Sequence, residues 1–325
     1  SSVVHATTTH KQWDKQKLDL LADHLKTSNA SSMMIIVEDE TLFSWGNVHQ
    51  KHLVHSIRKA LLNSLIGIEI DAGNLSLDTK LKDLGISDMP TPLNDSEKQA
   101  TLSDILKSRS GIYVPAAAVS QGMLYDMPSR GQHNPGEHFY YNNWDFNVAG
   151  HIYEQQSGLS IYHAFLEKIA KPLGMKHFRG EFQKINGTRN ETFSKNVDGF
   201  YQFETNKSKY PAYHFRLSAH DLALYGQLYL QHGQWQGKQI LSKAWIDKST
   251  QMYSLNNPKL GLGYGMLWNV VKRKDNTNKR NSFYHTGAGI HMLGVYPSMN
   301  MVMVHRVDTE SGVSYKRSDF YKMLS

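Results

Sequence analysis

The stretch "HSIRKALLNSLIG", residues 55–67, decides how this chain folds. From Ile57 onward it predicts a helix that is apolar on nearly every face, and such a helix belongs in the interior of a large domain. Ser56 nevertheless stands at its start, and Lys59 follows one turn later. Because lysine is almost never fully buried unless it is paired, this helix calls for a chemical explanation.

The length and composition of the chain limit which classes of protein it can be. The chain has 325 residues, enough for one large core or two smaller ones. Hydrophobic residues make up 40 % and charged residues 20 %, which is typical of a globular protein. No apolar run approaches the roughly 20 residues of a membrane span. The absence of cysteine excludes disulfides, thiolate metal sites and a cysteine nucleophile.

The net charge of +7 raises the question of an anionic partner. The basic residues are scattered, however, and their densest cluster, "KRKDNT" at 272–277, has the pattern of a hairpin loop. No nucleic-acid-binding motif is present. We therefore expect a basic surface and no nucleic-acid partner.

The N-terminal part predicts a helix from Lys11 to Leu25 and two strands, Met33 to Val37 and Thr41 to Trp45, joined by a tight turn. The buried helix after Ser56 follows and is expected to end near Gly73, a suitable cap.

The middle of the chain, residues 73–234, predicts helices and loops. Thr101 with Asp104 forms a capping-box pattern, and Ser218 caps a longer helix that ends at Gly233. After residue 234 the pattern changes to short β-rich segments and a closing helix, at 263–271, 282–287, 291–297, 301–307 and 315–324.

These elements predict an α/β (α+β) fold. Strands near both ends of the chain most simply form one antiparallel sheet flanked by helices. Residues 1–72 and 235–325 would build this sandwich lobe, and residues 73–234 would be inserted as a mostly helical lobe.

Ser56 and Lys59 lie on one face of the buried helix. The free N–H groups at a helix N-terminus can stabilise the negative oxygen that forms when a carbonyl is attacked. Apolar surroundings lower the pKa of a lysine, which can then accept the proton of a neighbouring hydroxyl. Ser56 is therefore predicted as a nucleophile that Lys59 activates.

Two further stretches carry polar side chains suited to such a site. Tyr141 and Asn143 precede a helix; a tyrosine can exchange protons with a nucleophile, and an asparagine amide can bind a carbonyl. His285, Thr286 and Gly287 end a predicted strand, where the glycine allows a ligand to approach the backbone. Each stretch taken alone also fits an ordinary packed turn.

Taken together, S-x-x-K, Y-x-N and H-T-G in this order resemble the penicillin-recognising serine hydrolases. The resemblance is to the branch of class C β-lactamases, D-alanyl-D-alanine carboxypeptidases, related esterases and 6-aminohexanoate-dimer hydrolases. It extends over about Met33 to Val307 through stretches such as "TLSDILKSRSGI" and "LSAHDLALYGQLYLQHGQWQGKQILS".

The resemblance implies an α/β lobe beside a helical lobe, with the site between them. Its implied roles are these: Ser56 is acylated, Lys59 and Tyr141 share the proton transfers, Asn143, His285, Thr286 and Gly287 bind substrate, and the backbone N–H groups of Ser56 and Ala288 form the oxyanion hole. It implies neither a cofactor nor a metal.

Two residues depart from the family pattern. Asn142 stands where serine is usual between Tyr141 and Asn143, and His285 stands where many relatives have lysine. Histidine loses its charge across the neutral range, so we expect His285 to make substrate preference depend on pH. We also expect weak β-lactamase activity, with peptidase and esterase activity both open.

Other catalytic and metal-binding motifs are missing. His49, His52 and His55 are spaced at three, but no H-E-x-x-H follows them, so the sequence predicts no metal. G-x-S-x-G and the P-loop pattern are absent.

The sequence thus predicts a serine hydrolase that cleaves an ester or amide, including a D-amino-acid peptide, through an acyl-enzyme. Its partner is a small-molecule or peptide-like substrate; the oligomeric state is not predicted. The alternatives are a non-catalytic binding or regulatory module with the same fold and, more remotely, a nucleic-acid binder. The first residues lack a signal-peptide pattern, which fits a cytoplasmic protein or a mature exported one whose signal has been removed. Of these we expect a periplasmic or secreted bacterial protein, with a cytoplasmic location as the alternative.

Overall fold

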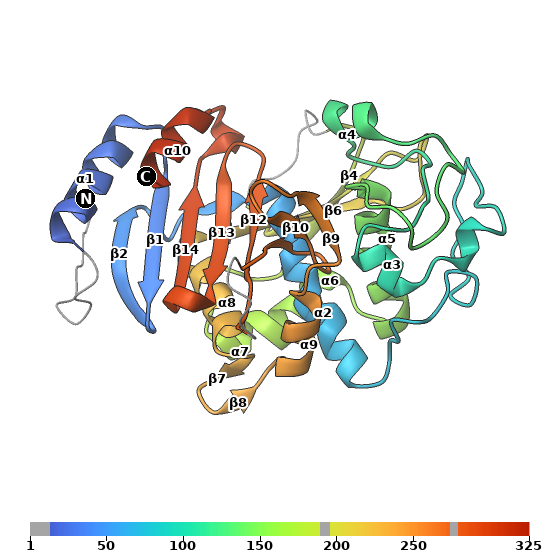
Figure 1. Cartoon of the computed structure of the whole chain (residues 1–325), viewed down its shortest axis with the longest axis horizontal. Helices are drawn as coiled ribbons and strands as arrows, with labels where there is room; N and C mark the ends of the chain where they lie inside the picture. Colours follow the sequence, from blue (N-terminus) through green and yellow to red (C-terminus); the bar gives the residue numbers. More distant parts are fainter. Residues whose placement is uncertain (1–13, 189–195, 274–278, 325) are drawn as a thin grey trace.

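The computed structural model describes residues 14–188, 196–273 and 279–324 (Figure 1). The first three residues of the predicted N-terminal helix, Lys11 to Trp13, and most of the predicted loop at 272–277 lie outside these ranges. In the described part, the first helix begins at Lys15, where the Asp14 side chain caps it.

A large antiparallel sheet organises the first lobe. In the described part of the chain it has eight strands in the order β2-β1-β14-β13-β12-β11-β10-β9. The predicted pairing of N-terminal with C-terminal strands is confirmed, because β1 lies beside β14 with Ile35 opposite Met303. The strands of this sheet are β1 Ser32–Val37, β2 Glu40–Gly46, β9 Ser254–Asn257, β10 Leu262–Tyr264, β11 Asn269–Val271, β12 Ser282–Gly287, β13 His291–Tyr296 and β14 Met301–Arg306.

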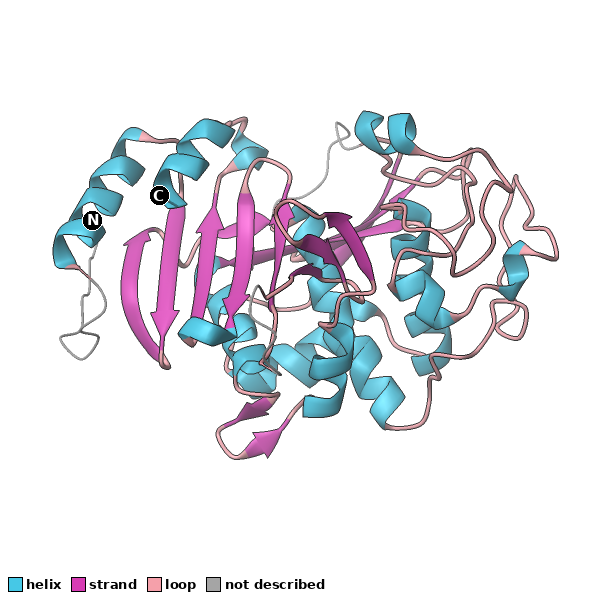
Figure 2. Ribbon diagram, in the orientation of Figure 1, coloured by secondary structure: helices cyan, strands magenta, loops and turns pink. Residues whose placement is uncertain are grey.

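Helices cover both faces of this sheet (Figure 2). Every residue of β1 is buried, as expected for a strand with both faces covered. Met33 and Ile35 pack in the cluster that includes Leu18 of α1, whereas Met34 and Ile36 pack on the opposite side, in the main core. The helices are α1 Lys15–Thr27, α2 Arg58–Asp71, α3 Leu102–Leu106, α4 Gln121–Asp126, α5 Asn143–Ser157, α6 Ile161–Phe165, α7 Lys171–Leu173, α8 Ala219–Leu230, α9 Lys243–Ser249 and α10 Arg317–Leu324.

The second lobe contains strands that the sequence did not predict. A four-stranded sheet in the order β3-β6-β5-β4 joins Lys51–Leu53 to Ala212–Ser218, Gly199–Phe203 and Phe182–Asn186. The middle of the chain is therefore not only helices and loops. Strand β6 is buried at every position, yet its sequence alternates the apolar Tyr213, Phe215 and Leu217 with polar residues. This period of two indicates a strand, and the prediction did not use it.

Helix α8 packs on the large sheet, although it falls within the range predicted as the helical lobe. Gly226 is the point of closest approach, since a Cβ there would lie 2.6 Å from Cγ1 of Val302 on β14. A small hairpin of β7, Gln234–Trp235, and β8, Lys238–Gln239, follows this helix. Among the described residues, no helix combines the length and the apolar character that a membrane crossing requires.

Helix α2 lies in the interior, as its sequence predicts. A 3₁₀ turn, His55–Ile57, precedes it, and Gly73 with φ +79° follows its end at the predicted cap position. The indole of Trp245 on α9 lies directly on the backbone of Gly67, where an added Cβ would be 2.1 Å from Cδ1 of the ring. The indole N–H also donates to the carbonyl of Asn63 at 3.0 Å. Only glycine leaves room for this contact.

We therefore expect Gly67→Ala to destabilise the protein. Alanine improves helix propensity by about 1 kcal/mol, but overpacking a rigid core typically costs about 1–3 kcal/mol, and this contact is closer than a side chain can tolerate. Urea unfolding followed by tryptophan fluorescence measures the free energy of unfolding. Gly122→Ala, in α4 with an added Cβ meeting nothing closer than 4.0 Å, is the matched control and should not destabilise the protein. Equal stabilities of the two variants would contradict the packing argument.

Candidate active site

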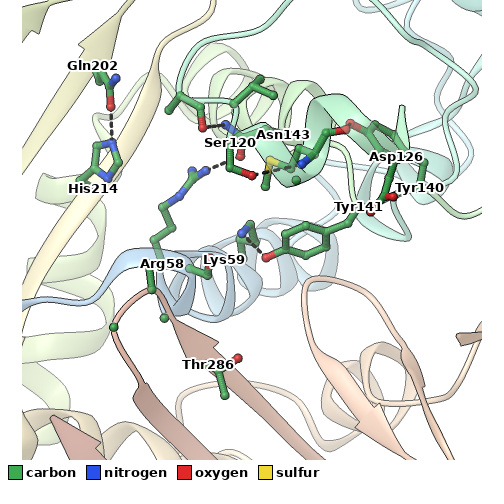
Figure 3. A pocket seen from close by; sticks show the side chains of 18 of the residues that line it. Arg58, Lys59, Ser120, Asp126, Tyr140, Tyr141, Asn143, Gln202, His214 and Thr286 are labelled. Atoms are coloured by element: carbon green, nitrogen blue, oxygen red, sulfur yellow. Dashed lines mark hydrogen bonds between the residues drawn. The ribbon is translucent and has the colours of Figure 1, made fainter. Parts of the chain in front are cut away.

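A cavity of about 960 Å³ opens between the lobes at the N-terminal end of α2 (Figure 3). Residues from all three predicted stretches line it: Ser56, Lys59, Tyr141, Asn143, Thr286, Gly287 and Ala288. His285 is not among the lining residues. The structure thus brings together all but one of the residues that the sequence predicted for the site.

Ser56 lies in the 3₁₀ turn between β3 and α2. His55, just before it, has φ +53°, a left-handed backbone conformation that residues other than glycine rarely adopt. The end of β12 presses against this turn, because a Cβ on Gly287 would lie 2.5 Å from the carbonyl oxygen of Val54 and 3.1 Å from Cβ of His55. Gly287 is therefore required for the close approach that puts the following residue, Ala288, beside the turn.

A chain of hydrogen bonds connects this turn to the C-terminal part of the protein. His55 Nε2 lies 2.8 Å from the hydroxyl of Thr309, and His291 Nε2 lies 3.2 Å from the same hydroxyl. Arg306 Nε donates to Nδ1 of His291 at 2.9 Å, and its Nη2 donates to the carbonyl of His52 at 2.8 Å. The C-terminal strands thereby fix the position of the residue next to Ser56.

Lys59 is paired, which answers the question that its burial raised. Its side chain, with the residue 1 % exposed, donates to the hydroxyl of Tyr141, and Nζ lies 4.4 Å and 4.6 Å from the ring centres of Tyr141 and Phe146. Burial raises the pKa of Tyr141, while a hydrogen bond with Ser56 and the charge of Arg58 act to lower it. Serine, tyrosine and lysine therefore form one connected set at the cavity.

Asn143 is held by the protein itself. Its side-chain oxygen accepts from Nη2 of Arg58 at 2.7 Å, and its amide donates to the carbonyls of Ala117 at 2.7 Å and Ala118 at 3.2 Å. The Arg58 guanidinium also lies 4.6 Å from the ring centre of Tyr213. Arg58 was not predicted as a site residue, although a charged residue between Ser56 and Lys59 in the most apolar helix was a signal for it.

Asn142, the departure from the usual serine, has a structural role. It caps α5, accepting from the backbone N–H of Trp144 at 3.2 Å, and its amide donates to the carbonyl of Ile112 at 2.6 Å. The side chain is buried and does not line the cavity. An asparagine at this position thus fastens the helix to a neighbouring loop.

The buried position of His285 contradicts the expectation that its ring carries a pH-dependent charge. Successive residues of a strand point to opposite faces, so the exposed side of β12 presents Thr286 and the interior receives His285. Its Nε2 donates to the carbonyl of Leu267 at 2.6 Å, and Nδ1 accepts from Asn269 at 3.4 Å. Burial, with the nearby charge of Lys59, lowers the pKa of His285 to about 3. The ring is neutral at every pH from 5.5 to 9.

Comparison with known families decides the identity of the fold. The family model described as Beta-lactamase matches residues 19–324. The chain belongs to the beta-lactamase family. The sequence-based resemblance and the predicted fold class are thereby confirmed, and members of this family are serine hydrolases. No curated protein matches this family member in sequence.

Solved structures agree with this assignment of the fold. The penicillin-binding protein homologue from Pyrococcus abyssi, an octamer, matches with a TM-score of 0.65 and 19 % identity over 91 % of this chain and 74 % of that chain. A 6-aminohexanoate-dimer hydrolase homologue from Bacillus anthracis matches with a TM-score of 0.64 and 18 % identity over 93 % of this chain and 79 % of that one. A family VIII carboxylesterase matches with a TM-score of 0.64 and 14 % identity over 95 % of both chains.

The buried histidines make the stability of this beta-lactamase family member depend on pH. Burial lowers the pKa of His52 to about 4, of His285 to about 3 and of His305 to about 4. In the unfolded chain these groups titrate near 6.5, so the unfolded state binds more protons between about pH 6.5 and pH 4. The free energy of unfolding should therefore fall as the pH drops through this window, by about 1.4 kcal/mol per unit for each fully neutral histidine.

The variant His285→Gln tests how much the His285 ring contributes to the pH dependence of the free energy of unfolding. It removes the titrating group, so its free energy of unfolding should fall less steeply than that of the wild type between pH 6 and pH 4.5. The measurement is a urea titration at each pH. The exposed His163→Gln in α6 is the control and should keep the wild-type slope. A slope for His285→Gln parallel to the wild type would contradict the buried neutral ring.

Proposed function

We propose that this protein is a serine hydrolase that cleaves an ester or amide bond through an acyl-enzyme on Ser56. The observation that carries the proposal is the hydrogen-bonded set of Ser56, Tyr141 and Lys59 at the N-terminal end of α2. These residues line a cavity that is large enough for a small molecule or a short peptide. A nucleophile within reach of a proton acceptor that a third group orients is the arrangement that nucleophilic catalysis requires.

The proposed reaction has two steps. The Ser56 hydroxyl attacks the substrate carbonyl while its proton passes to the Tyr141–Lys59 pair, and the same pair returns a proton to the leaving alcohol or amine. The negative oxygen of the intermediate lies against the backbone N–H groups of Ser56 and Ala288. Water then attacks the acyl-serine while the pair accepts its proton, and the pair returns that proton to Ser56 Oγ as the bond to the acyl group breaks and the acid is released. Lys59 and Tyr141 act as one unit throughout.

The surroundings of the cavity support a substrate class. The β12 face of the cavity offers the Thr286 hydroxyl and the backbone, because the His285 ring is interior and neutral. No fixed positive charge on this strand faces a substrate carboxylate; the basic residues that line the cavity, such as Lys207 and Arg317, come from other parts of the chain. We therefore propose esters and neutral amides as the main substrates, with D-amino-acid peptides as a narrower candidate and weak activity on β-lactams.

A substrate screen tests this proposal. It should compare p-nitrophenyl esters, D-alanyl peptides, ω-amino-acid oligomers and nitrocefin, with kcat/KM as the readout. We expect the highest values for esters or neutral amides and the lowest for nitrocefin. Hydrolysis of none of them, with no covalent labelling, would favour the non-catalytic module with the same fold.

Ser56 should be the site of covalent labelling by a fluorophosphonate probe. Peptide mass mapping of the adduct should find the label on Ser56, and Ser56→Ala should lower kcat by about 10³-fold or more, since the nucleophile is lost. Ser64→Ala is the matched control, because Ser64 lies in α2 outside the lining of the cavity and its hydroxyl donates to the carbonyl of Leu61 at 3.0 Å. A label on another residue, or full activity in Ser56→Ala, would refute the assignment.

A double-mutant cycle tests the proton-handling pair. Lys59→Met and Tyr141→Phe should each lower kcat by about 10²- to 10⁴-fold, and the double variant should be little worse than the poorer single one. Lys59→Met combined with Tyr140→Phe is the control, because the Tyr140 hydroxyl donates instead to the carbonyl of Met123 and should give additive changes in log kcat. Additive losses for Lys59 and Tyr141 would mean that the two residues act independently.

A further inference from the structure

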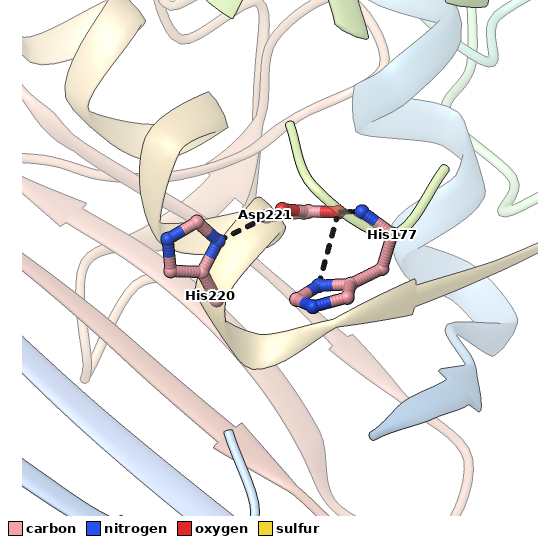
Figure 4. Close-up of side chains that lie close together, drawn as sticks. All are labelled: His177, His220 and Asp221. Carbon is pink, nitrogen blue, oxygen red and sulfur yellow. Dashed lines mark hydrogen bonds and ion pairs between the residues drawn. The ribbon is translucent and has the colours of Figure 1, made fainter. Parts of the chain in front are cut away.

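Away from the cavity, three side chains with metal-binding atoms lie close together. His177 follows α7, and His220 and Asp221 form the first turn of α8; Figure 4 shows both imidazoles turned toward the carboxylate. Nδ1 of His220 lies 2.9 Å from Oδ1 of Asp221, and Nδ1 of His177 lies 3.6 Å from Oδ2. One candidate ligand atom from each residue lies within 4.8 Å of the other two.

We propose that His177, His220 and Asp221 bind a divalent transition-metal ion, with Zn²⁺ as the best-matched ion and His49 as a fourth ligand. Nitrogen and oxygen ligands lie about 2.0–2.2 Å from zinc, so two of them in a tetrahedral site are roughly 3.3 Å apart. The separations of 2.9 Å and 3.6 Å bracket this value. This site is independent of the proposed hydrolase activity, and it replaces the expectation from sequence that the protein holds no metal.

Asp221 is already oriented as a ligand. It is fully buried, and its two oxygens accept from the backbone N–H groups of Lys176 at 3.0 Å and His177 at 2.9 Å. These bonds leave lone pairs on both oxygens directed toward the imidazoles. Partners of this kind fix a ligating group before the ion arrives and strengthen its binding.

The Nδ1 atoms of both histidines face the buried carboxylate of Asp221. The Nδ1 atom of His177 also lies 2.9 Å from the Ser218 hydroxyl, a bond that the ion would replace. A metal ion would satisfy both Nδ1 atoms and would balance the buried carboxylate.

His49 lies beside the three ligands and could reach the ion as a fourth. Its ring centre is 5.0 Å from that of His177 and 5.4 Å from that of His220, and two imidazoles on one tetrahedral ion have centres about 5 Å apart. The backbone N–H of His220 donates to the carbonyl of Val48 at 2.9 Å, which holds this loop against α8. The side chain of His49 is exposed and can turn toward the ion. The ion would then connect three segments that are far apart in the sequence.

Calorimetric titration with ZnCl₂ tests the site, using chelator-treated protein without an affinity tag. We expect one Zn²⁺ per chain with a Kd in the micromolar range or below. His220→Ala and His177→Ala should each weaken binding at least about tenfold, and His49→Ala less. His133→Ala is the matched control, because it removes a ring from another surface histidine pair, with centres 4.0 Å apart, and should bind zinc as the wild type does.

A second measurement covers the case in which a variant folds poorly. Zn²⁺ should raise the Tm of the wild type and of His133→Ala, but should raise that of His220→Ala far less. Co²⁺ bound to the wild type should give the intense visible absorption of a four-coordinate site and be displaced by Zn²⁺. Millimolar zinc affinity in the wild type, or equal affinity in the wild type and His220→Ala, would overturn the proposal.

Discussion

The pairing of the buried Lys59 amine with the Tyr141 hydroxyl is the interaction on which the rest of the structure depends. Burying the polar end of a lysine is costly unless hydrogen-bonding and aromatic groups surround it. Here those groups come from different lobes, since Lys59 lies in the first turn of α2 and Tyr141 with Phe146 belongs to the α5 region. The two lobes must therefore meet at the start of α2, and the cavity forms at this junction.

The apolar core around α2 allows these polar side chains to be buried. Two adjacent basic residues, Arg58 and Lys59, are buried at the start of a helix whose other buried residues are mostly apolar. Such a helix would not stay buried in a small domain. It is stable because the surrounding core is continuous from the large sheet through α8 and α5, so that the polar turn at its start is a small part of a large apolar interface.

The sequence predicted what depends on local spacing. Ser56 and Lys59 share a face because helix geometry fixes residues three apart, and β1 with β14 follows from short apolar runs. It did not predict what depends on tertiary contact. Nothing near His285 in the sequence shows that its ring faces Leu267 rather than the cavity. Strands β4 and β5 were missed because neither shows a regular alternation of polar and apolar residues. Strand β6 does alternate, with Tyr213, Phe215 and Leu217 at every second position, and could have been predicted.

The hydrogen bond between His55 and Thr309 spans 254 positions of the chain. Ribosomes add about 5–20 residues per second, so the turn at residues 55–57 leaves the ribosome roughly 13–50 s before the hydroxyl that fixes it. During that interval the turn lacks its hydrogen bond to Thr309. The hydrolase activity proposed for Ser56 would therefore begin only after the two distant halves of the sheet have joined.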